Sequence, residues 1–136
     1  MGRSCVIVVD SSALVAILED EPDAERFLKA LHEASRRLAS AVTIYETGIV
    51  ILRKRGRERL ASFADFIEAT GIEPVPFTEP YVSLALEAYA RFGKGVDPKA
   101  RLNMGDCASY ALARSFDAPL LFKGDDFGAT DIRQYA

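Results

Sequence analysis

Cysteine and histidine are scarce, since the chain of 136 residues contains two cysteines and one histidine. Cys5 and Cys107 are too few for a disulfide framework and lack the close spacing of paired metal ligands. We expect both thiols to be reduced and buried, because free cysteine is usually buried. With so few thiolate and imidazole ligands, a zinc site is not expected. His32 stands alone on a predicted helix surface and is assigned no catalytic role.

Long hydrophobic runs are missing as well. No stretch approaches the roughly 20 apolar residues that a membrane-spanning helix needs. Residues 1–4 lead into a short apolar segment rather than the core of a signal peptide. We therefore expect a cytoplasmic protein without a membrane partner. Hydrophobic residues make up 49% and charged residues 27% of the chain, and this composition and length predict one globular domain over residues 1–136.

An overall excess of positive charge is also lacking. The formal net charge is −3, which excludes a general binder of polyanions. Positive charge is nevertheless concentrated in one place, because residues 53–59 hold five basic side chains and one acidic side chain.

Short apolar strands alternate with amphipathic helices along the chain. The β-branched run at residues 5–9 predicts a central strand buried on both faces. Further strands are expected at 37–40, 72–77 and 119–122, and helices at 11–18, 22–34, 43–54, 57–69, 79–92 and 104–115. Pro74 and Pro76 favour a sheet edge for their strand, and Asn103 can cap the last helix. This alternation predicts an α/β fold, a three-layer sandwich with a largely parallel sheet.

Four acidic motifs stand out, at residues 8–12, 44–46, 105–107 and 124–127. In each motif a carboxylate lies beside or within an apolar stretch, where an unpaired charge is costly. The key acids are Asp10, Glu46, Asp106 and the pair Asp125 and Asp126. Asp131 is a further candidate close to the last motif.

Each acid also has a purely structural explanation. Asp10 or Ser11 can cap the following helix, and Glu46 can be solvent-exposed or pair with Arg53. Asp106 can complement a helix dipole in a first turn, whereas aspartates at 125 and 126 suit a turn. Asp10, Asp125 and Asp126 nevertheless follow strands, and ligands of parallel sheets bind at the carboxyl ends of strands. A shared site of oxygen ligands, without histidine or thiolate, favours Mg²⁺ or Mn²⁺.

In their order along the chain, these motifs resemble the PIN-domain ribonucleases, specifically VapC toxins of VapBC toxin–antitoxin pairs. The resemblance is carried by residues 6–14, 91–95, 102–107, 110–113, 118–127 and 130–132. It implies a PIN-like sheet of about five parallel strands and Mg²⁺- or Mn²⁺-dependent endonucleolytic cleavage of RNA by a metal-activated water. It also implies a VapB-like antitoxin as partner and a homodimer.

The resemblance extends to individual positions. Asp10, Glu46 and Asp106 match the best-defined acidic positions of the family. Asp126 is favoured as the fourth acid, and Asp125 either supports the metal ligands from beside them or is the alternative ligand. Ser12 matches a hydroxyl position beside the metal. The resemblance thus implies Asp10, Glu46, Asp106 and Asp126 as catalytic residues and Asp10, Asp106, Asp126 and Asp125 as metal ligands.

RNA binding next to acidic groups requires nearby cations. Arg53, Lys54, Arg55 and Arg57 are the first candidates, and Arg91, Lys94, Lys99 and Arg101 form a second set. Such contacts would position the phosphate backbone without reading its sequence. The alternative is a solvated helix end whose cations complement the helix dipole. Family antitoxins commonly block the metal site with a basic side chain, so RNA and antitoxin are expected to compete.

Two other functions compete with the nuclease hypothesis. The first is a phosphohydrolase or phosphotransferase with an aspartyl nucleophile at Asp10 and a phosphate-contacting lysine at Lys123. However, the residues after Asp10 lack the second acid that haloacid-dehalogenase-like enzymes carry two positions on. The second is a non-enzymatic binding module whose acidic pocket holds a structural ion or a basic peptide. The sequence does not identify the RNA or the number of metal ions.

Overall fold

The structure is a computed structural model that describes residues 5–135. Residues 1–4 and 136, which the sequence also assigns to the domain, lie outside the described residues. Four strands form one sheet: β1 (Val6–Val9), β2 (Arg36–Ser40), β3 (Ile72–Val75) and β4 (Leu120–Leu121). Their order is β3-β2-β1-β4, and all three pairings are parallel.

The sheet agrees with the expectation in most respects. β1 is central and β3 lies at an edge, as the prolines of that segment predicted. The resemblance implied about five strands, whereas the described residues form four. A single parallel bridge between Leu120 and Gln134 adds one more backbone pairing at β4.

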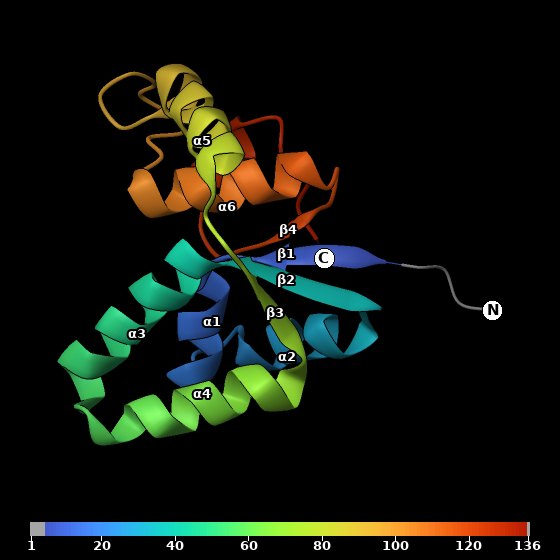
Figure 1. The fold of residues 1–136 in the computed structure, drawn as a ribbon, viewed down its shortest axis with the longest axis vertical. Helices are drawn as coiled ribbons and strands as arrows, with labels where there is room; N and C mark the ends of the chain where they lie inside the picture. The colour runs from blue at the N-terminus through green and yellow to red at the C-terminus, as the bar shows by residue number, and fades with distance from the viewer. Residues whose placement is uncertain (1–4, 136) are drawn as a thin grey trace.

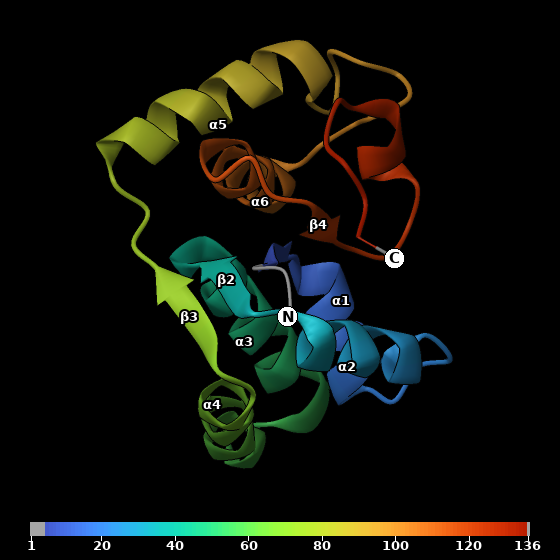
Figure 2. The same cartoon turned by 90° about the vertical axis from the view of Figure 1, so that its right-hand side faces the viewer.

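Helices cover both faces of the sheet, which gives three layers (Figures 1 and 2). On one side lie α1 (Ser11–Leu18), α2 (Ala24–Glu33), α3 (Ala41–Arg55) and α4 (Glu58–Thr70); on the other lie α5 (Glu79–Phe92) and α6 (Met104–Ser115). A short 3₁₀ helix, η1, spans Asp126–Ala129. Within residues 5–135, none of the helices has both the length and the apolar character that crossing a bilayer would require.

The two faces of the sheet bury separate hydrophobic clusters. Successive side chains of a strand point to opposite faces, so Ile7 and Val9 pack with the helices of the first side, whereas Val8 packs with α5 and α6. Cys107 is buried as predicted. The prediction for Cys5 is wrong in degree, because this residue is only partly buried at the start of β1.

Two helix starts differ from the sequence prediction by two residues, and the other helix boundaries agree to within one residue. α3 begins at Ala41 rather than residue 43, because the Ser40 side chain accepts a hydrogen bond from the amide of Val42 at 3.1 Å and caps the helix. α2 begins at Ala24, so Pro22 is not its first residue. The amide of Glu21 instead bonds to the carbonyl of Ala16 and holds a turn after α1.

The strand ends set the position of the site. β1 and β2 are each followed almost directly by a helix, α1 at Ser11 and α3 at Ala41. β4 ends at Leu121, close to the loop that leads to η1. Because these strands are parallel neighbours, their carboxyl ends lie at one edge of the sheet.

Candidate active site

Asp10 lies at the end of β1 and is 2% exposed. Its Oδ2 accepts hydrogen bonds from the backbone amide and the hydroxyl of Ser12, at 3.0 and 2.7 Å. Its Oδ1 accepts one from the hydroxyl of Ser109 at 2.6 Å. Asp10 is therefore the N-cap of α1 and at the same time a buried carboxylate held from two sides. The structural and functional explanations of Asp10 do not exclude each other.

Ser109 and Thr43 are site residues that the sequence analysis missed. Both are fully buried, and their hydroxyl oxygens lie 3.2 Å apart. Ser109 follows Asp106 by three positions on α6, so the two share a helix face. That spacing was the available signal, but serine is common enough in helices that the spacing alone did not single it out.

Ser12 links the site to the end of β4. Its hydroxyl donates to Asp10 and accepts a hydrogen bond from the amide of Lys123 at 2.9 Å. The ammonium of Lys123 is engaged elsewhere, since it lies 2.6 Å from Glu21 and 3.8 Å from Asp23. This pairing weakens the phosphatase alternative, which required Lys123 to contact a phosphate.

Glu46 projects from α3 toward the same edge and is partly buried. Its carboxylate lies against Gly105, where an added Cβ would come within 2.7 Å of Glu46 Cδ. Burial raises the pKa of Glu46, a hydrogen bond from Ser11 opposes that rise, and the charge of Asp10 adds to it. Within residues 5–135, Glu46 forms no ion pair with Arg53, so that structural explanation fails.

Asp106 is the third residue of α6 and closes a capping box with Asn103. The amide of Asp106 donates to Asn103 Oδ1 at 2.8 Å, and the amide of Asn103 donates to Asp106 Oδ2 at 3.0 Å. Burial raises the pKa of Asp106 to about 7, against the hydrogen bond from Asn103. The carboxylates of Asp10, Glu46 and Asp126 raise it further.

The last acid comes from η1 and the loop before it. Asp126 is partly buried and lies close enough to Asp106 to raise its pKa. Asp125 is exposed and is not among the carboxylates that shift Asp106. Asp126 also lines a small hollow together with Asn103, the cap of α6. Since Ser109 of α6 binds Asp10 and Glu46 lies against Gly105, the acids at 10, 46, 106 and 126 all lie around the first turns of α6, and Asp125 is exposed at the rim.

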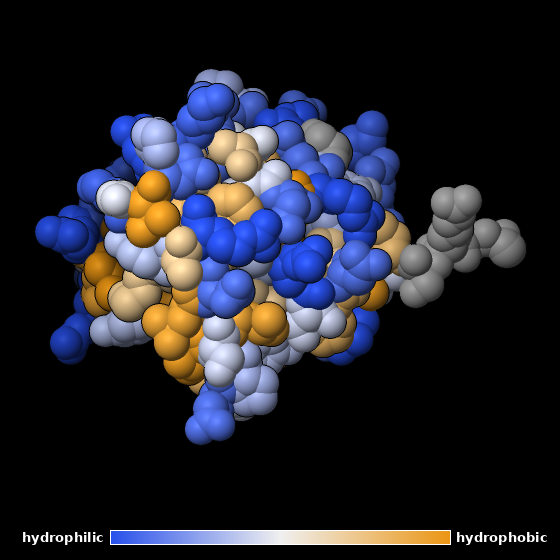
Figure 3. Space-filling model, turned by 90° about the horizontal axis from the view of Figure 1, so that it is seen from above, coloured by the Kyte–Doolittle hydropathy of each residue, from blue (hydrophilic) through white to orange (hydrophobic). Residues whose placement is uncertain are grey.

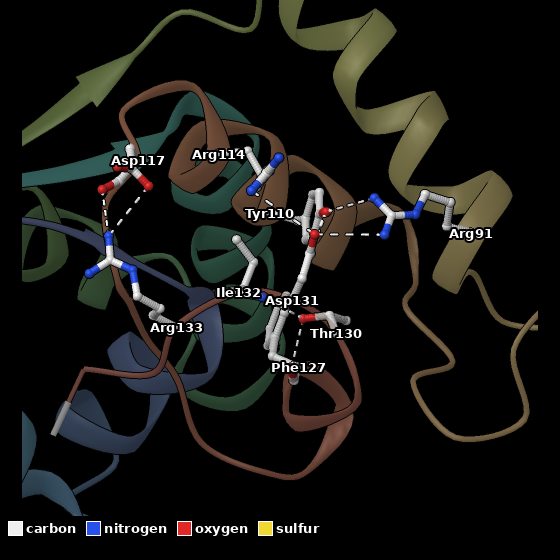
Figure 4. A network of polar contacts seen from close by, with 9 residues as sticks. All are labelled: Arg91, Tyr110, Arg114, Asp117, Phe127, Thr130, Asp131, Ile132 and Arg133. Atoms are coloured by element: carbon white, nitrogen blue, oxygen red, sulfur yellow. Dashed lines mark hydrogen bonds and ion pairs between the residues drawn. The ribbon is translucent and has the colours of Figure 1, made fainter.

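Asp131 belongs to a different cluster (Figure 4). Its Oδ1 accepts a hydrogen bond from the hydroxyl of Tyr110 at 2.6 Å. Its Oδ2 lies 3.6 Å from Arg91 of α5 and 4.0 Å from Arg114 of α6. Burial opposes ionisation of Asp131, but the Tyr110 hydroxyl and the two guanidinium groups leave its pKa below the usual value. Asp131 therefore fixes the segment after η1 to both helices.

The donor set suits a hard divalent cation. All four clustered groups are carboxylates, and oxygen ligands are those that Mg²⁺ and Mn²⁺ prefer. Within residues 5–135, no three acidic, histidine or cysteine side chains already stand in an ion-holding arrangement. Burial is the main reason why the pKa of Asp106 is raised, and repulsion by Asp10, Glu46 and Asp126 adds to it. A bound cation would offset that repulsion. The residues therefore fit a divalent metal ion.

The first set of cations lies away from this cluster. Arg53, Lys54, Arg55 and Arg57 are all exposed, at the end of α3 and just beyond it. Arg53 follows Glu46 by about two helical turns. Arg55 is paired with Glu19, with donor–acceptor distances of 2.9 and 3.2 Å.

Comparison with known proteins identifies the family. Residues 7–133 match the PIN domain. The chain is 43% identical over 128 residues to Ribonuclease VapC28 of Mycobacterium tuberculosis, covering 94% of this chain and 96% of that protein. It is 42% identical over 130 residues to Ribonuclease VapC30 of the same species, covering 96% and 98%.

The fold agrees with a solved structure of M. tuberculosis VapC20, described as a Sarcin-Ricin loop cleaving toxin. The TM-score is 0.77 at 17% identity, covering 95% of this chain and 98% of that one. At this identity the likeness shows the fold alone. Because the PIN-domain match and both VapC relatives cover nearly the whole chain, the chain belongs to the PIN-domain family, among its VapC ribonucleases.

Proposed function

We propose that this protein is a metal-dependent endoribonuclease, the toxin of a type II toxin–antitoxin pair in the cytoplasm. The observation that carries the proposal is geometric: Asp10 is bound by Ser109 of α6, and Glu46 lies against Gly105, the neighbour of Asp106. Asp126 lines a hollow beside Asn103, which caps the same helix. Family membership supports the choice of RNA over other phosphate esters.

Each acid has a separate task in the proposed reaction. Asp10, Asp106 and Asp126 would hold Mg²⁺ or Mn²⁺, with Asp125 as an additional or alternative ligand at the rim. When bound, the ion supplies an activated water and positive charge against the phosphate. Ser12 and Ser109 hold both oxygens of Asp10 in place, and Asn103 holds Oδ2 of Asp106. Glu46, whose pKa is raised, is suited to accept a proton at its carboxylate.

A VapB-like antitoxin is the proposed protein partner. A basic side chain of such a partner could pair with the acid cluster. A partner bound there would exclude RNA from the cluster.

We also propose a homodimer. The face seen from the side of α5 and α6 is largely hydrophilic with interspersed apolar areas (Figure 3). Val82, Leu86 and Tyr89 on α5 are 38%, 67% and 40% exposed, and a second copy could cover these apolar side chains.

The proposed function is tested with purified Asp10→Asn and Asp106→Asn. Each substitution should lower Mg²⁺-dependent RNA cleavage at least about 100-fold, because each removes a charge from the proposed metal site. Circular dichroism serves as the control for an intact fold. EDTA should abolish cleavage by the wild type, and phosphatase substrates should remain unhydrolysed. Cleavage that persists in both variants would refute the site, and toxicity that survives both would favour the non-enzymatic binding module.

A further inference from the structure

A small hollow adjoins the acid cluster on the side of the loop before α6. It has a volume of about 280 Å³ and is lined by Lys94, Arg101, Asn103 and Asp126. Asp126 belongs to the acid cluster, and Asn103 caps the helix that carries Asp106. The hollow therefore shares Asp126 with the proposed catalytic groups, whereas two of its four lining residues, Lys94 and Arg101, are cationic.

Neither cation of this hollow is ion-paired in the described residues, although Asp126 also lines the hollow. Within residues 5–135, neither Lys94 nor Arg101 forms an ion pair or a side-chain hydrogen bond. Other cations around the site are engaged: Arg91 lies near Asp131, and Lys123 bonds to Glu21. Two exposed cations with no acidic partner, beside a group of carboxylates, are placed to receive an anion.

The loop that carries them is held in a defined shape. The amide of Lys94 donates to the carbonyl of Leu102 at 2.8 Å, and the carbonyl of Lys94 accepts from the hydroxyl of Tyr89 at 2.7 Å. The Asp97 side chain accepts from the amide of Lys99 at 2.7 Å, and Leu102 is fully buried. The backbone that carries the two exposed side chains is thus held by hydrogen bonds within the loop and to Tyr89.

Arg101 has a φ of +48°, in the left-handed region. This conformation is unfavourable for residues with a Cβ, and asparagine and aspartate tolerate it better than arginine does. The other two non-glycine residues with positive φ are both aspartates, among residues 5–135. Strained backbone of this kind gathers at functional sites, and here it holds a guanidinium group at the edge of the hollow.

We propose that Lys94 and Arg101 form a phosphate subsite that receives the RNA backbone next to the cleaved linkage. The inference rests on the proposed function. A phosphodiester chain that passes over several carboxylates needs neighbouring positive charge, and this hollow supplies it directly beside Asp126. The cations at the end of α3 are less suited, because they begin two turns beyond Glu46 and Arg55 is bound to Glu19.

Binding is measured by fluorescence anisotropy with a labelled single-stranded RNA of roughly 12 mixed-sequence nucleotides, between about 50 and 200 mM salt. The Asp10→Asn background prevents cleavage during the titration. Adding Lys94→Gln and Arg101→Gln should raise Kd about tenfold, and the slope of log Kd against log salt should fall by about 1.4, or 0.7 for each lost phosphate contact. The matched control, Lys29→Gln with Arg133→Gln, removes the same charge from exposed positions outside both candidate RNA surfaces and should change Kd less than about twofold.

A single Arg101→Gly variant excludes unfolding as the cause. Glycine accepts positive φ without strain, so this protein should be at least as stable as the wild type and yet bind RNA more weakly. A larger loss of affinity with Arg53→Gln and Arg57→Gln would overturn the proposal in favour of the α3 end. If all double variants, including the control, lost RNA affinity equally, the proposal would be overturned, because RNA would then bind through overall positive charge rather than at one site. Unchanged RNA affinity with weakened binding of poly-glutamate would reassign the hollow to an acidic peptide.

Failure of this proposal is separable from failure of the proposed function. A wild-type protein that cleaves RNA with Mg²⁺, while the Lys94 and Arg101 variant binds RNA normally, refutes the subsite alone. A wild-type protein that neither binds nor cleaves RNA refutes both.

Discussion

At position 105, the absence of a side chain decides where Glu46 can lie. A Cβ there would overlap the Glu46 carboxylate, so Gly105→Ala should push that carboxylate out of the cluster. We expect RNA cleavage to fall about 10- to 100-fold, since small misplacements at an active site have effects of this size. The helix itself should be unharmed, because alanine is the better helix former.

Gly48→Ala is the matched control. Gly48 also lies within a helix, two residues from Glu46, but an added Cβ would meet only Leu60 and Phe63, each at 3.9 Å. Cleavage rates and urea unfolding are measured for Gly105→Ala and Gly48→Ala, and only Gly105→Ala should cleave RNA more slowly. Wild-type cleavage by Gly105→Ala would show that Glu46 does not need its present position.

Asp106 should make the metal-free protein less stable as the pH rises. Its pKa is raised from 3.8 to about 7, so the folded chain keeps a proton that the unfolded chain releases. The stabilisation from this group is complete below about pH 4 and is lost as the pH rises through about 7. Because the carboxyl is partly exposed, we expect a loss on the order of 1–2 kcal/mol rather than the full value of the shift.

Urea unfolding in EDTA over this pH range tests the assignment. Asp106→Asn has no titrating group at this position, so its free energy of unfolding should fall less between about pH 4 and pH 7. Parallel pH profiles for the two proteins would contradict the raised pKa.

At the scale of elements, the segment after η1 depends on Asp131. Asp131→Ala leaves the buried Tyr110 hydroxyl without its acceptor and should cost about 1–3 kcal/mol of unfolding free energy. Asp131→Asn keeps an acceptor and loses only half-exposed ion pairs, so about 1 kcal/mol or less is expected. Urea denaturation of the two variants measures both losses of unfolding free energy.

Cleavage by the same two variants distinguishes positioning from metal binding. Asp131→Asn should retain most of its activity, and Asp131→Ala should lose more because the segment that carries Asp126 is less firmly held. If Asp131→Asn were as inactive as Asp126→Asn, Asp131 rather than Asp126 would complete the site.

For the whole molecule, a bound ion should tie together elements from both ends of the chain. Asp10 follows the first strand, Glu46 lies on α3, and Asp126 follows the last strand. An ion that binds only this folded arrangement stabilises it, by roughly 1.4 kcal/mol at ten times its Kd. The urea midpoint of the wild type should therefore rise with Mg²⁺, and that of Asp10→Asn should not. Equal shifts in both proteins would place the ion elsewhere.

Local patterns in the sequence were sufficient for most of the elements. The apolar run of β1 and the Asn103 cap of α6 each lie within a few residues, so their physics is local. The α3 helix was predicted, but the apolar residues expected to line its buried face, Tyr45, Ile49 and Leu52, are exposed, and Thr43, Thr47 and Ile51 are buried instead. The start of α2 was misplaced because the turn at Glu21 depends on a bond back to Ala16. The edge position of β3 was predictable, since proline removes a backbone donor.

The sequence by itself determined the α/β class, the candidate acids and the preference for a hard metal ion, because these follow from residue types and short spacings. Only the tertiary structure decided which acids meet. It separated Asp126 from Asp131, brought Ser109 to Asp10, placed Glu46 against Gly105 and left Lys94 and Arg101 unpaired beside the cluster. These outcomes depend on contacts between segments far apart in the chain, and such contacts form only when the sheet and its two helical layers pack together.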